Sequence, residues 1–385
     1  MRIFRIPLKI LSKSLAHPLV VSTIAAVLNP RSKDFSFGSV QSLLVLKLDE
    51  IGDFVLVTPF LRELRRNTPQ AYVCLVVKPA VYELAETCPY VNRVLIYDWN
   101  ALSDGASLLR RQWRALRLAW TELRRRRFDA VLIPRLDADT YHATHLAVYS
   151  GSKAILAYTE KSTTTKSTIN RGFDRLISHV TVSKMPFGHE TEINLALLEN
   201  HGAVIVSSAL ELWLTSDDEA FARAAIPDGQ RYVAVATGAS KEYKRWPEKR
   251  YAQLALWLRE KYGFVPLLFG AKNDPLLPGE RSFLGLSLRK TAALLGRCTL
   301  FVGNDSGLKH MAAAIRTPVV EINALRIGQS AVHHISPMRF RAWGIRQQVI
   351  QPPPGLNDCA IEEVSLSAVQ DAVDRMISEM EPRMS

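Results

Sequence analysis

The stretch GNDSGLKH at 303–310 contains the residue types that a phosphate-binding turn needs. It follows an apolar run and precedes a helical pattern, so a small residue such as Gly307 stands where a helix begins. Free backbone N–H groups at that point attract anions, and Ser306 and His310 add polar side chains nearby. A helix cap alone would explain the serine, and a lone histidine is more often satisfied inside a core. The cluster of small and polar residues exceeds what a cap needs, which favours a phosphate site.

A second turn of this kind lies at 237–244. It follows the apolar run 232–236, contains Gly238 and Ser240, and ends at Lys244. The ammonium group of a lysine acts as a point charge on a diphosphate. The C-terminal half is therefore expected to bind a phosphorylated ligand.

A carboxylate stands at the corresponding place in the N-terminal half. In LLVLKLDEIGDFVLVTPFL, at 43–61, an apolar run leads through a tight connection to Gly52 and Asp53, near which a helical pattern starts. Strand, glycine turn and helix bring side chains to the carboxyl edge of an α/β sheet. Asp53 either stabilises the helix N-terminus through the helix dipole or acts as a general base. The spacing alone favours the first role.

A third polar group has the look of a metal site. Asp137 and Asp139 form an Asp-x-Asp, and His142 and His145 follow three residues apart. The motif is short, and two histidines at this spacing more often bond the local backbone or solvent. We expect no metal here. A loop that lines a substrate at the end of a strand is the favoured interpretation.

The composition indicates a globular protein with an anionic partner. The chain has 385 residues, enough for two domains, and its formal net charge is +12. Its mean hydropathy of +0.01 and its four cysteines without CxxC spacing fit a globular protein from a reducing compartment. Anionic lipid and a phosphorylated small molecule are the candidate partners. Nucleic acid is not expected, because no zinc-finger, RNP or helix-turn-helix spacing is present.

Residues 1–33 are basic and contain no acid. The apolar part, 15–28, is interrupted by His17 and Pro18 and is too short to span a bilayer. The segment either lies on an anionic membrane surface or is a flexible extension, and the sequence favours neither.

Strand-like runs alternate with helical patterns along both halves, which predicts βαβ units and mostly parallel sheets. The strands are expected at 43–48, 72–77, 93–97 and 130–133, and again at 232–236, 264–269, 300–302 and 318–322. Two such halves in succession predict a cleft where their carboxyl edges face each other. The predicted divisions are a basic extension at 1–40, an acceptor domain with the carboxylate turn at 41–208, a donor domain with the phosphate-suited turns at 209–362 and a terminal helix at 363–385.

The pattern at 108–127 predicts a long helix with eight arginines. Large apolar side chains recur at helical spacing and are expected to form its buried stripe. The members of this stripe are Leu109, Trp113, Leu116, Trp120 and Leu123. The arginines would then occupy the other faces.

Four segments resemble glycosyltransferase family 9, the bacterial ADP-heptose:lipopolysaccharide heptosyltransferases. They are LLVLKLDEIGDFVLVTPFLREL, HETEINLALL, KRWPEKRYAQL and LRKTAALLGRCTLFVGNDSGLKHMAAAIRTPVV. The last is the most specific, because it combines an Ala-Ala-Leu-Leu helix, the Asp-Ser-Gly turn and Thr-Pro-Val-Val. The resemblance covers roughly 43–325.

The resemblance implies a GT-B fold of two Rossmann-like domains and an inverting, metal-independent transfer with Asp53 as general base. It implies no cofactor beyond an ADP-linked sugar as co-substrate, and a lipopolysaccharide-core or other cell-surface glycan as acceptor. The donor's diphosphate would contact Ser240, Lys244, Asp305, Ser306, Gly307 and His310, and its nucleoside Asn273 and Asp274. Residues expected on the acceptor side are Gly52, Asp137 and His142. Such an enzyme works in the cytoplasm, at the inner face of the inner membrane.

The sequence departs from the family pattern near the phosphate turn. Lys309 adds a positive charge, and Glu321, Ile322 and Asn323, followed by ALRIGQSAVHH, stand where the family has a Gly-Pro-Thr stretch that lines the sugar. The basic N-terminal extension is also unusual for the family. The alternatives are therefore a UDP- or GDP-sugar transferase of capsule or O-antigen synthesis and, in another class, a non-catalytic glycan- or lipid-binding module.

Overall fold

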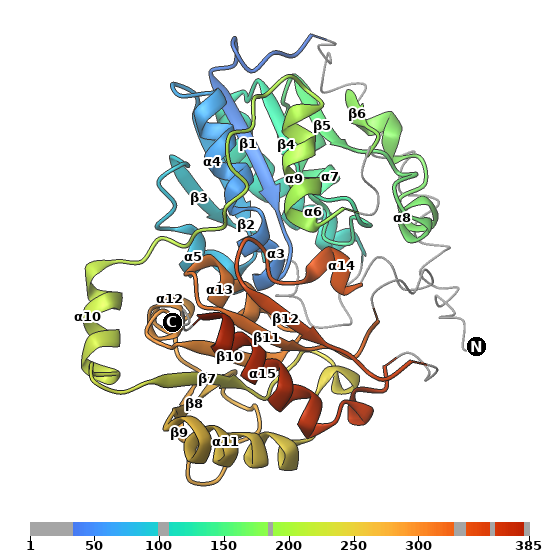
Figure 1. Ribbon diagram of the computed structural model, residues 1–385. Helices are drawn as coiled ribbons and strands as arrows, with labels where there is room; N and C mark the ends of the chain where they lie inside the picture. The colour runs from blue at the N-terminus through green and yellow to red at the C-terminus, as the bar shows by residue number, and fades with distance from the viewer. Residues whose placement is uncertain (1–33, 99–107, 184–187, 327–335, 355–358, 381–385) are drawn as a thin grey trace. The chain divides into compact units, whose positions relative to one another are not determined.

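The computed structural model divides the chain into two compact units (Figure 1). It describes residues 34–98, 108–183, 188–326, 336–354 and 359–380. Unit 1 comprises residues up to Glu50 together with Pro59–Ser208, and unit 2 comprises Ile51–Thr58 and Ala209–Ser385. The short segment that carries Asp53 thus has its contacts in unit 2.

Unit 1 contains a six-stranded sheet in the order β3-β2-β1-β4-β5-β6, with every neighbouring pair parallel. Its strands are β1 (Ser42–Lys47), β2 (Tyr72–Val77), β3 (Arg93–Ile96), β4 (Ala130–Ile133), β5 (Ala154–Tyr158) and β6 (His179–Thr181). The helices of this part of the chain are α4 (Thr58–Asn67), α5 (Tyr82–Ala85), α6 (Leu108–Leu118), α7 (Ala143–Tyr149), α8 (Thr164–Ile169) and α9 (Glu190–Glu199).

Unit 2 contains a second six-stranded parallel sheet, in the order β12-β11-β10-β7-β8-β9. Its strands are β7 (Tyr232–Ala236), β8 (Val265–Gly270), β9 (Arg281–Leu284), β10 (Leu300–Asn304), β11 (Val319–Ile322) and β12 (Gln347–Ile350). Its helices are α3 (Ile51–Leu56), α10 (Ser216–Ala225), α11 (Glu248–Tyr262), α12 (Leu288–Leu295), α13 (Gly307–Ala314), α14 (Pro337–Phe340) and α15 (Leu366–Met380).

Both sheets have the strand order 3-2-1-4-5-6 of the doubly wound Rossmann fold when strands are counted within each unit. The prediction of two Rossmann-like α/β halves is confirmed. In such sheets ligands bind where the strand order reverses, outside the carboxyl ends of the strands. That point lies between β1 and β4 in unit 1 and between β7 and β10 in unit 2, which are the four strands whose turns the sequence singles out.

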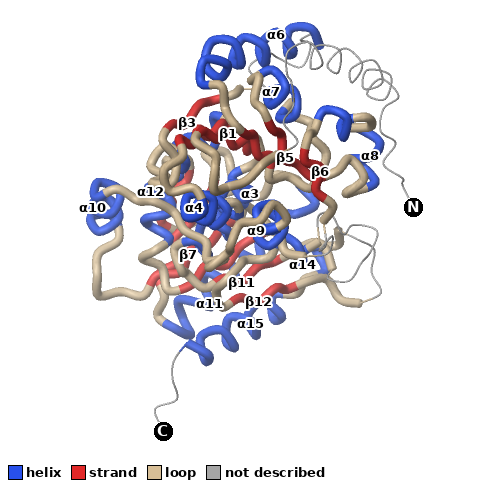
Figure 2. The backbone as a smooth tube through the Cα atoms, turned by 90° about the horizontal axis from the view of Figure 1, so that it is seen from above, coloured by secondary structure: helices blue, strands red, loops and turns tan. Residues whose placement is uncertain are grey.

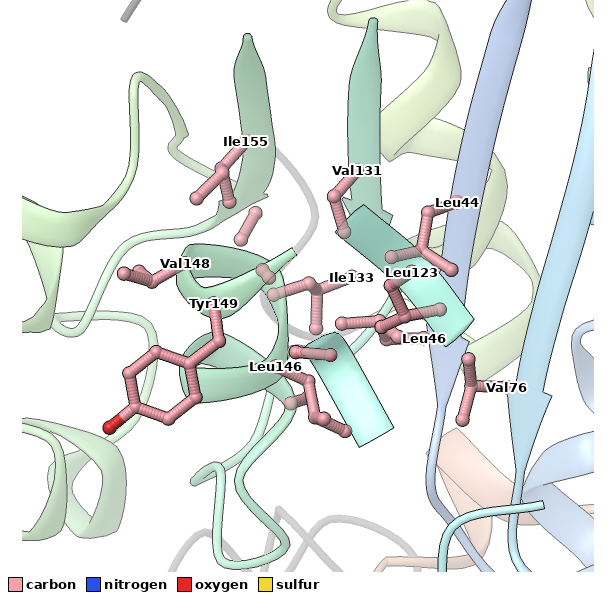
Figure 3. Packing of buried hydrophobic residues seen from close by; sticks show 14 of the residues in the cluster. Leu44, Leu46, Val76, Leu123, Val131, Ile133, Leu146, Val148, Tyr149 and Ile155 are labelled. Carbon is pink, nitrogen blue, oxygen red and sulfur yellow. The ribbon is translucent and has the colours of Figure 1, made fainter. Parts of the chain in front are cut away.

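Apolar strands fix the core of each unit. In unit 1, Leu44 and Leu46 of β1 and Val131 of β4 pack against Leu146 of α7 (Figure 3). In unit 2, α11 and α15 cover one face of the sheet, and α15 lies alongside β11 and β12 in Figure 1. The predicted terminal helix is therefore part of the core of unit 2.

The sequence did not anticipate the edge strands β6, β9 and β12 or the inner strand β5. The three edge strands have four residues or fewer. An edge strand buries less side-chain surface and so carries a weaker apolar pattern than a central one, whereas β5 is fully buried and was missed although it is apolar. The segment 159–171 contains α8 with Thr163 as its N-cap and a buried Lys166.

The predicted stripe of the long helix is confirmed at Leu123 and wrong at Trp113, Leu116 and Trp120. The helix is continuous through α6, a π-helical turn η2 (Ala119–Leu123) and a 3₁₀ turn η3 (Arg124–Arg126). Trp113 is 61% exposed and Trp120 67% exposed, whereas Ala115, Ala119 and Leu123 are buried in the core. The alanines follow the same helical spacing as the tryptophans, so periodicity alone could not choose the face. Small residues on the inner face let α6 approach α7, beside which it lies in Figure 2.

Two expectations concern membranes. The basic segment 1–33 lies outside the described residues, as do 99–107, 184–187, 327–335, 355–358 and 381–385. No helix in the described part of the chain has both the length and the apolar character to cross a bilayer.

The revised register of the long helix gives a stability prediction. Replacing Leu123, fully buried, by Ala should lower the free energy of unfolding by about 2–5 kcal/mol because it leaves a cavity. Leu116→Ala, at a 36% exposed position, should cost about 1 kcal/mol or less. Urea denaturation followed by circular dichroism measures both values. A larger loss from Leu116→Ala than from Leu123→Ala would contradict the observed register.

Candidate functional site

The two polar turns of unit 2 meet at the point where its strand order reverses. Asn304, at the end of β10, is fully buried and donates from Nδ2 to the carbonyl oxygen of Thr237, at 2.8 Å. Its Oδ1 accepts from the Trp246 backbone N–H at 3.1 Å and from the Tyr251 hydroxyl at 2.9 Å. Asn304 therefore holds the turn after β7 against the turn after β10, and its amide is used within the fold.

An ion pair joins the functional side chains of these turns. Lys244 Nζ lies 2.5 Å from Asp305 Oδ2, and the two side chains are 17% and 12% exposed. An ammonium group has three donors, so this pairing leaves others for a ligand. The Asp305 carboxylate is oriented toward lysine, which makes it a group that positions Lys244 instead of one that contacts an anionic phosphate.

One buried network contains three residues that depart from the family pattern: Lys309, Glu321 and Asn323. Lys309 Nζ contacts Asp305 Oδ1 at 2.5 Å and Glu321 Oε1 at 2.6 Å, and Lys309 and Glu321 are both 0% exposed. Asn323 Nδ2 donates to the same Glu321 oxygen at 2.5 Å, and its Oδ1 accepts from the Leu325 backbone N–H at 2.8 Å. The extra cation and the extra carboxylate therefore compensate each other.

Burial and pairing compete in setting the ionisation of this network. Burial by itself raises the pKa of Asp305, but Lys309 and Lys244 outweigh it and hold that pKa far below its ordinary value. Burial would lower the pKa of Lys309, and its two carboxylate partners raise it instead. For Glu321 burial dominates, so its pKa is raised despite Lys309. Because the pKa of Asp305 is lower in the folded chain than in the unfolded one, its stabilising effect is present near neutral pH and is lost as the pH falls through the acid range.

The N-terminus of α13 follows directly on the turn after β10, and its N-cap hydroxyl is buried. Ser306 is the N-cap residue, yet its hydroxyl makes no capping hydrogen bond and no other bond to any residue that the structure describes. The first backbone N–H groups of an α-helix have no partner within the helix. A hydroxyl, free N–H groups and the Lys244 ammonium thus occur together at one sheet edge, which suits a diphosphate.

A short helix brings Asp53 to this edge. Within unit 2, α3 contacts α13 closely: a Cβ at Gly52 would lie 2.8 Å from His310 Cδ2, and one at Gly307 would lie 3.2 Å from Ile51 Cβ. A side chain at Gly52 would therefore require the His310 ring to move, and one at Gly307 would require a smaller shift of Ile51. α3 starts at Ile51, so Asp53 is in the first turn and is not the cap. Gly52, expected on the acceptor side, lies against the donor-side residues Gly307 and His310.

The two residues expected to contact the nucleoside, Asp274 and Asn273, have different environments. Asp274 accepts from the Ala271 backbone N–H at 2.7 Å and closes the turn after β8. It fills the space beside Gly238, where a Cβ would lie 2.0 Å from Asp274 Oδ2. Asn273 and Ser240 are exposed on these two turns.

In unit 1, the metal-like loop has a structural explanation. Asp139 is buried, and its carboxylate accepts from the backbone N–H groups of Tyr141, Ala143 and Thr144 at 3.2, 3.0 and 2.7 Å, which caps α7. The rings of His142 and His145 lie 4.7 Å apart between centroids. No group of three His, Cys, Asp or Glu side chains in the described residues is arranged to hold a metal ion.

Asp137 lines a small pocket of unit 1 together with Arg135 and Lys166. Lys166 is buried and donates to the carbonyl oxygen of Tyr158 at 2.9 Å. Burial lowers the pKa of Lys166 to about 8, with Asp139 opposing the shift. No sequence pattern singles out this lysine, because it lies in a Thr- and Ser-rich stretch with no apolar periodicity.

A second buried lysine stands where the strand order of unit 1 reverses. Lys47, the one charge in β1, lies 3.0 Å from Asp49 and donates to the Pro134 carbonyl oxygen at 3.0 Å. It therefore ties the end of β1 to the loop after β4. In the sequence, a charged residue within an apolar strand could have indicated both Lys47 and Glu321 of β11 as buried, paired groups.

The sequence of the chain is similar to that of known glycosyltransferases. A family model described as glycosyltransferase family 9 (heptosyltransferase) matches residues 119–325. The lipooligosaccharide heptosyltransferase 2 of Haemophilus ducreyi is 40% identical over 90 residues, which cover 20% of this chain and 25% of that protein. The chain thus aligns with about a quarter of the length of this curated relative.

Solved structures share the fold over nearly the whole chain. The glycosyl transferase family 9 protein of Veillonella parvula has a TM-score of 0.72 at 17% identity and covers 90% of this chain and 100% of its own. The ADP-heptose LPS heptosyltransferase II of Escherichia coli has a TM-score of 0.67 at 18% identity, covering 89% and 100%. At these identities the similarity shows the fold.

The buried network gives a second stability prediction. Lys309→Met should lower the free energy of unfolding by about 3–5 kcal/mol, because it removes the cation that pairs with two buried carboxyl groups and leaves Glu321 buried without its partner. The double variant Lys309→Met/Glu321→Leu should recover most of that loss, since Lys244 still pairs with Asp305. Urea denaturation of both single variants and of the double variant measures the coupling. Strictly additive losses would contradict a Lys309–Glu321 pair.

Proposed function

The chain belongs to glycosyltransferase family 9, and we propose that it transfers a sugar from a nucleotide-diphospho-sugar to a lipopolysaccharide-core or related cell-surface glycan. The observation that carries this proposal is the contact between α3 and α13, because it sets the helix of Asp53 against the phosphate-suited turn. The transfer is inverting and independent of metal in this proposal. Heptose is the sugar, since the relatives are named heptosyltransferases.

The donor's diphosphate would bind at the turn after β10. Lys244 supplies a positive charge, and the Ser306 hydroxyl and the N–H groups of α13 supply hydrogen bonds. These groups are held in place by Asn304 and Asp305 before any ligand arrives. Donors that are fixed in advance stabilise the charge that grows on a leaving diphosphate.

Asp53 would act as the general base. As the acceptor oxygen attacks the anomeric carbon, the Asp53 carboxylate takes the hydroxyl proton. The new bond between carbon and acceptor oxygen forms while the bond from that carbon to the diphosphate oxygen breaks. The nucleotide leaves with the bonding electron pair, and the configuration at the anomeric carbon inverts. The transition state resembles an oxocarbenium ion, as in glycoside hydrolysis.

ADP is the proposed nucleotide, as in the name of the Escherichia coli relative. Isothermal titration of the full chain with ADP, UDP and GDP tests this assignment and the alternative of a UDP- or GDP-sugar enzyme. Lys244→Met should weaken ADP binding about tenfold or more, because a charge-assisted contact to phosphate is lost. The same variant should bind adenosine, which has no phosphate, as the wild type does. If UDP or GDP bound more tightly than ADP, the ADP assignment would be wrong. If no nucleotide bound, the transferase proposal would be refuted and a non-catalytic module would be favoured.

The role of Asp53 has its own test. Asp53→Asn should lower the transfer rate about 10²–10⁴-fold, while the affinity for ADP stays nearly unchanged. The matched control is Asp217→Asn, which removes another acid from the first turn of a helix, in α10. Turnover is measured by release of the nucleotide from the sugar donor that the titration identifies. An Asp53→Asn protein with normal turnover would remove this residue from the base role.

A further inference from the structure

The outer face of α6 carries apolar side chains that the core does not use. Trp113, Leu116 and Trp120 follow one another at steps of three and four residues, so they lie on one side of the helix. Their exposed fractions are 61%, 36% and 67%. Among the residues that the structure describes, Trp113 and Trp120 are the tryptophans with more than half of their surface exposed.

The inner face of the same helix is already occupied. Ala115, Ala119 and Leu123 belong to the core of unit 1, and the Tyr149 hydroxyl of α7 donates to Gln112 at 2.8 Å. A rotation that buried the tryptophans would expose this inner face. The exposed apolar side chains are therefore a fixed feature of the fold.

Arginines stand beside these apolar side chains. The Arg117 guanidinium lies 5.8 Å from the ring centroid of Trp113, and that of Arg124 lies 5.2 Å from the ring of Trp120. We call these five residues, Trp113, Leu116, Arg117, Trp120 and Arg124, the α6 face. The one acid in 108–127 is Glu122, which pairs with Arg93 at 2.7 Å. Within 108–127 no unpaired carboxylate offsets the positive charge of the α6 face, to which Arg117 contributes an exposed guanidinium and Arg124 a half-buried one that also donates to the Tyr149 carbonyl oxygen at 3.3 Å.

We propose that the α6 face docks on an anionic phospholipid surface. Tryptophan is favoured at the boundary between lipid and water, where its ring is buried and its N–H stays hydrated. Arginines beside it attract anionic headgroups, and the long side chains keep their charge in the interface. A helix with this division between apolar and basic residues lies in the plane of the interface.

Other partners fit the α6 face less well. In a two-fold dimer the same face would meet itself and bring Arg117 and Arg124 of both copies together. Single-stranded nucleic acid stacks on aromatic rings, but Leu116 between the tryptophans offers no ring for stacking. Anionic lipid satisfies the aliphatic, aromatic and basic side chains together.

This inference rests on the proposed function in one respect, since a glycolipid acceptor would be embedded in the surface on which the α6 face docks. The docking site is distinct from the basic segment 1–33, which is present in every protein tested below. Binding through the α6 face therefore shows as a difference between variants of the full chain.

The test is co-sedimentation of the full chain with vesicles of equal parts phosphatidylcholine and phosphatidylglycerol, compared with pure phosphatidylcholine. Trp113→Ala/Trp120→Ala should weaken binding to the anionic vesicles about tenfold or more. Arg117→Gln/Arg124→Gln should weaken it about thirtyfold at low salt and reduce its salt dependence. The matched control is Leu256→Ala/Leu276→Ala, which removes two exposed leucines of unit 2 and should bind as the wild type does. Brominated lipid in the vesicles should quench tryptophan fluorescence of the wild type more than that of the tryptophan variant.

Unchanged vesicle binding by both α6 variants would overturn the proposal. It would also be overturned if the variants altered the sedimentation coefficient without lipid, which indicates a second copy, or if a single-stranded oligonucleotide displaced the wild type from anionic vesicles. Titration with ADP on the same proteins separates this proposal from the proposed function. Nucleotide binding without vesicle binding refutes only the docking site, and vesicle binding without nucleotide binding refutes only the transferase.

Discussion

A charge inside an apolar fold must be paired, and the pairing of Lys309 shapes the candidate site. This lysine has no exposed surface and lies between two carboxylates, one from its own helix and one from β11. Asp305 has a second cation, Lys244, on its other oxygen. Lys309 thus helps to hold the carboxylate that pairs with Lys244. The pairing explains how the fold accommodates the extra lysine and the extra glutamate.

Unit 1 also contains a buried lysine that is paired at the carboxyl edge of its sheet. Lys47 stands at the end of β1, next to the point where the strand order reverses, and holds Asp49 and the start of the loop after β4. In each unit a buried lysine, Lys47 or Lys309, forms ion pairs near the sheet edge at which doubly wound folds bind ligands. Parallel strands end together at that edge, so one buried cation can restrain two turns that are far apart in the sequence.

The long helix shows how packing volume decides which side of a helix is buried. Its alanines allow close approach to α7, and its tryptophans are too large for that space and face outward. The outer face then combines bulky apolar groups with arginine, which is unusual for a surface that meets only water. A membrane-embedded acceptor would give this surface a purpose in the proposed reaction, because docking there would raise the local concentration of acceptor.

The sequence by itself determined the α/β class, eight of the twelve strands that the structure describes, and the turns that carry Asp53, Lys244 and Ser306, because these depend on apolar runs and on local turn chemistry. Only the tertiary structure decided which face of the long helix is buried, that α3 packs on α13, and that Lys309, Asp305 and Glu321 form one network. These features depend on side-chain volume and on pairs of residues distant in the chain, neither of which has a period along the sequence. Asp53 lies next to Gly52. Only the fold shows that His310 packs against Gly52 because Gly52 has no Cβ.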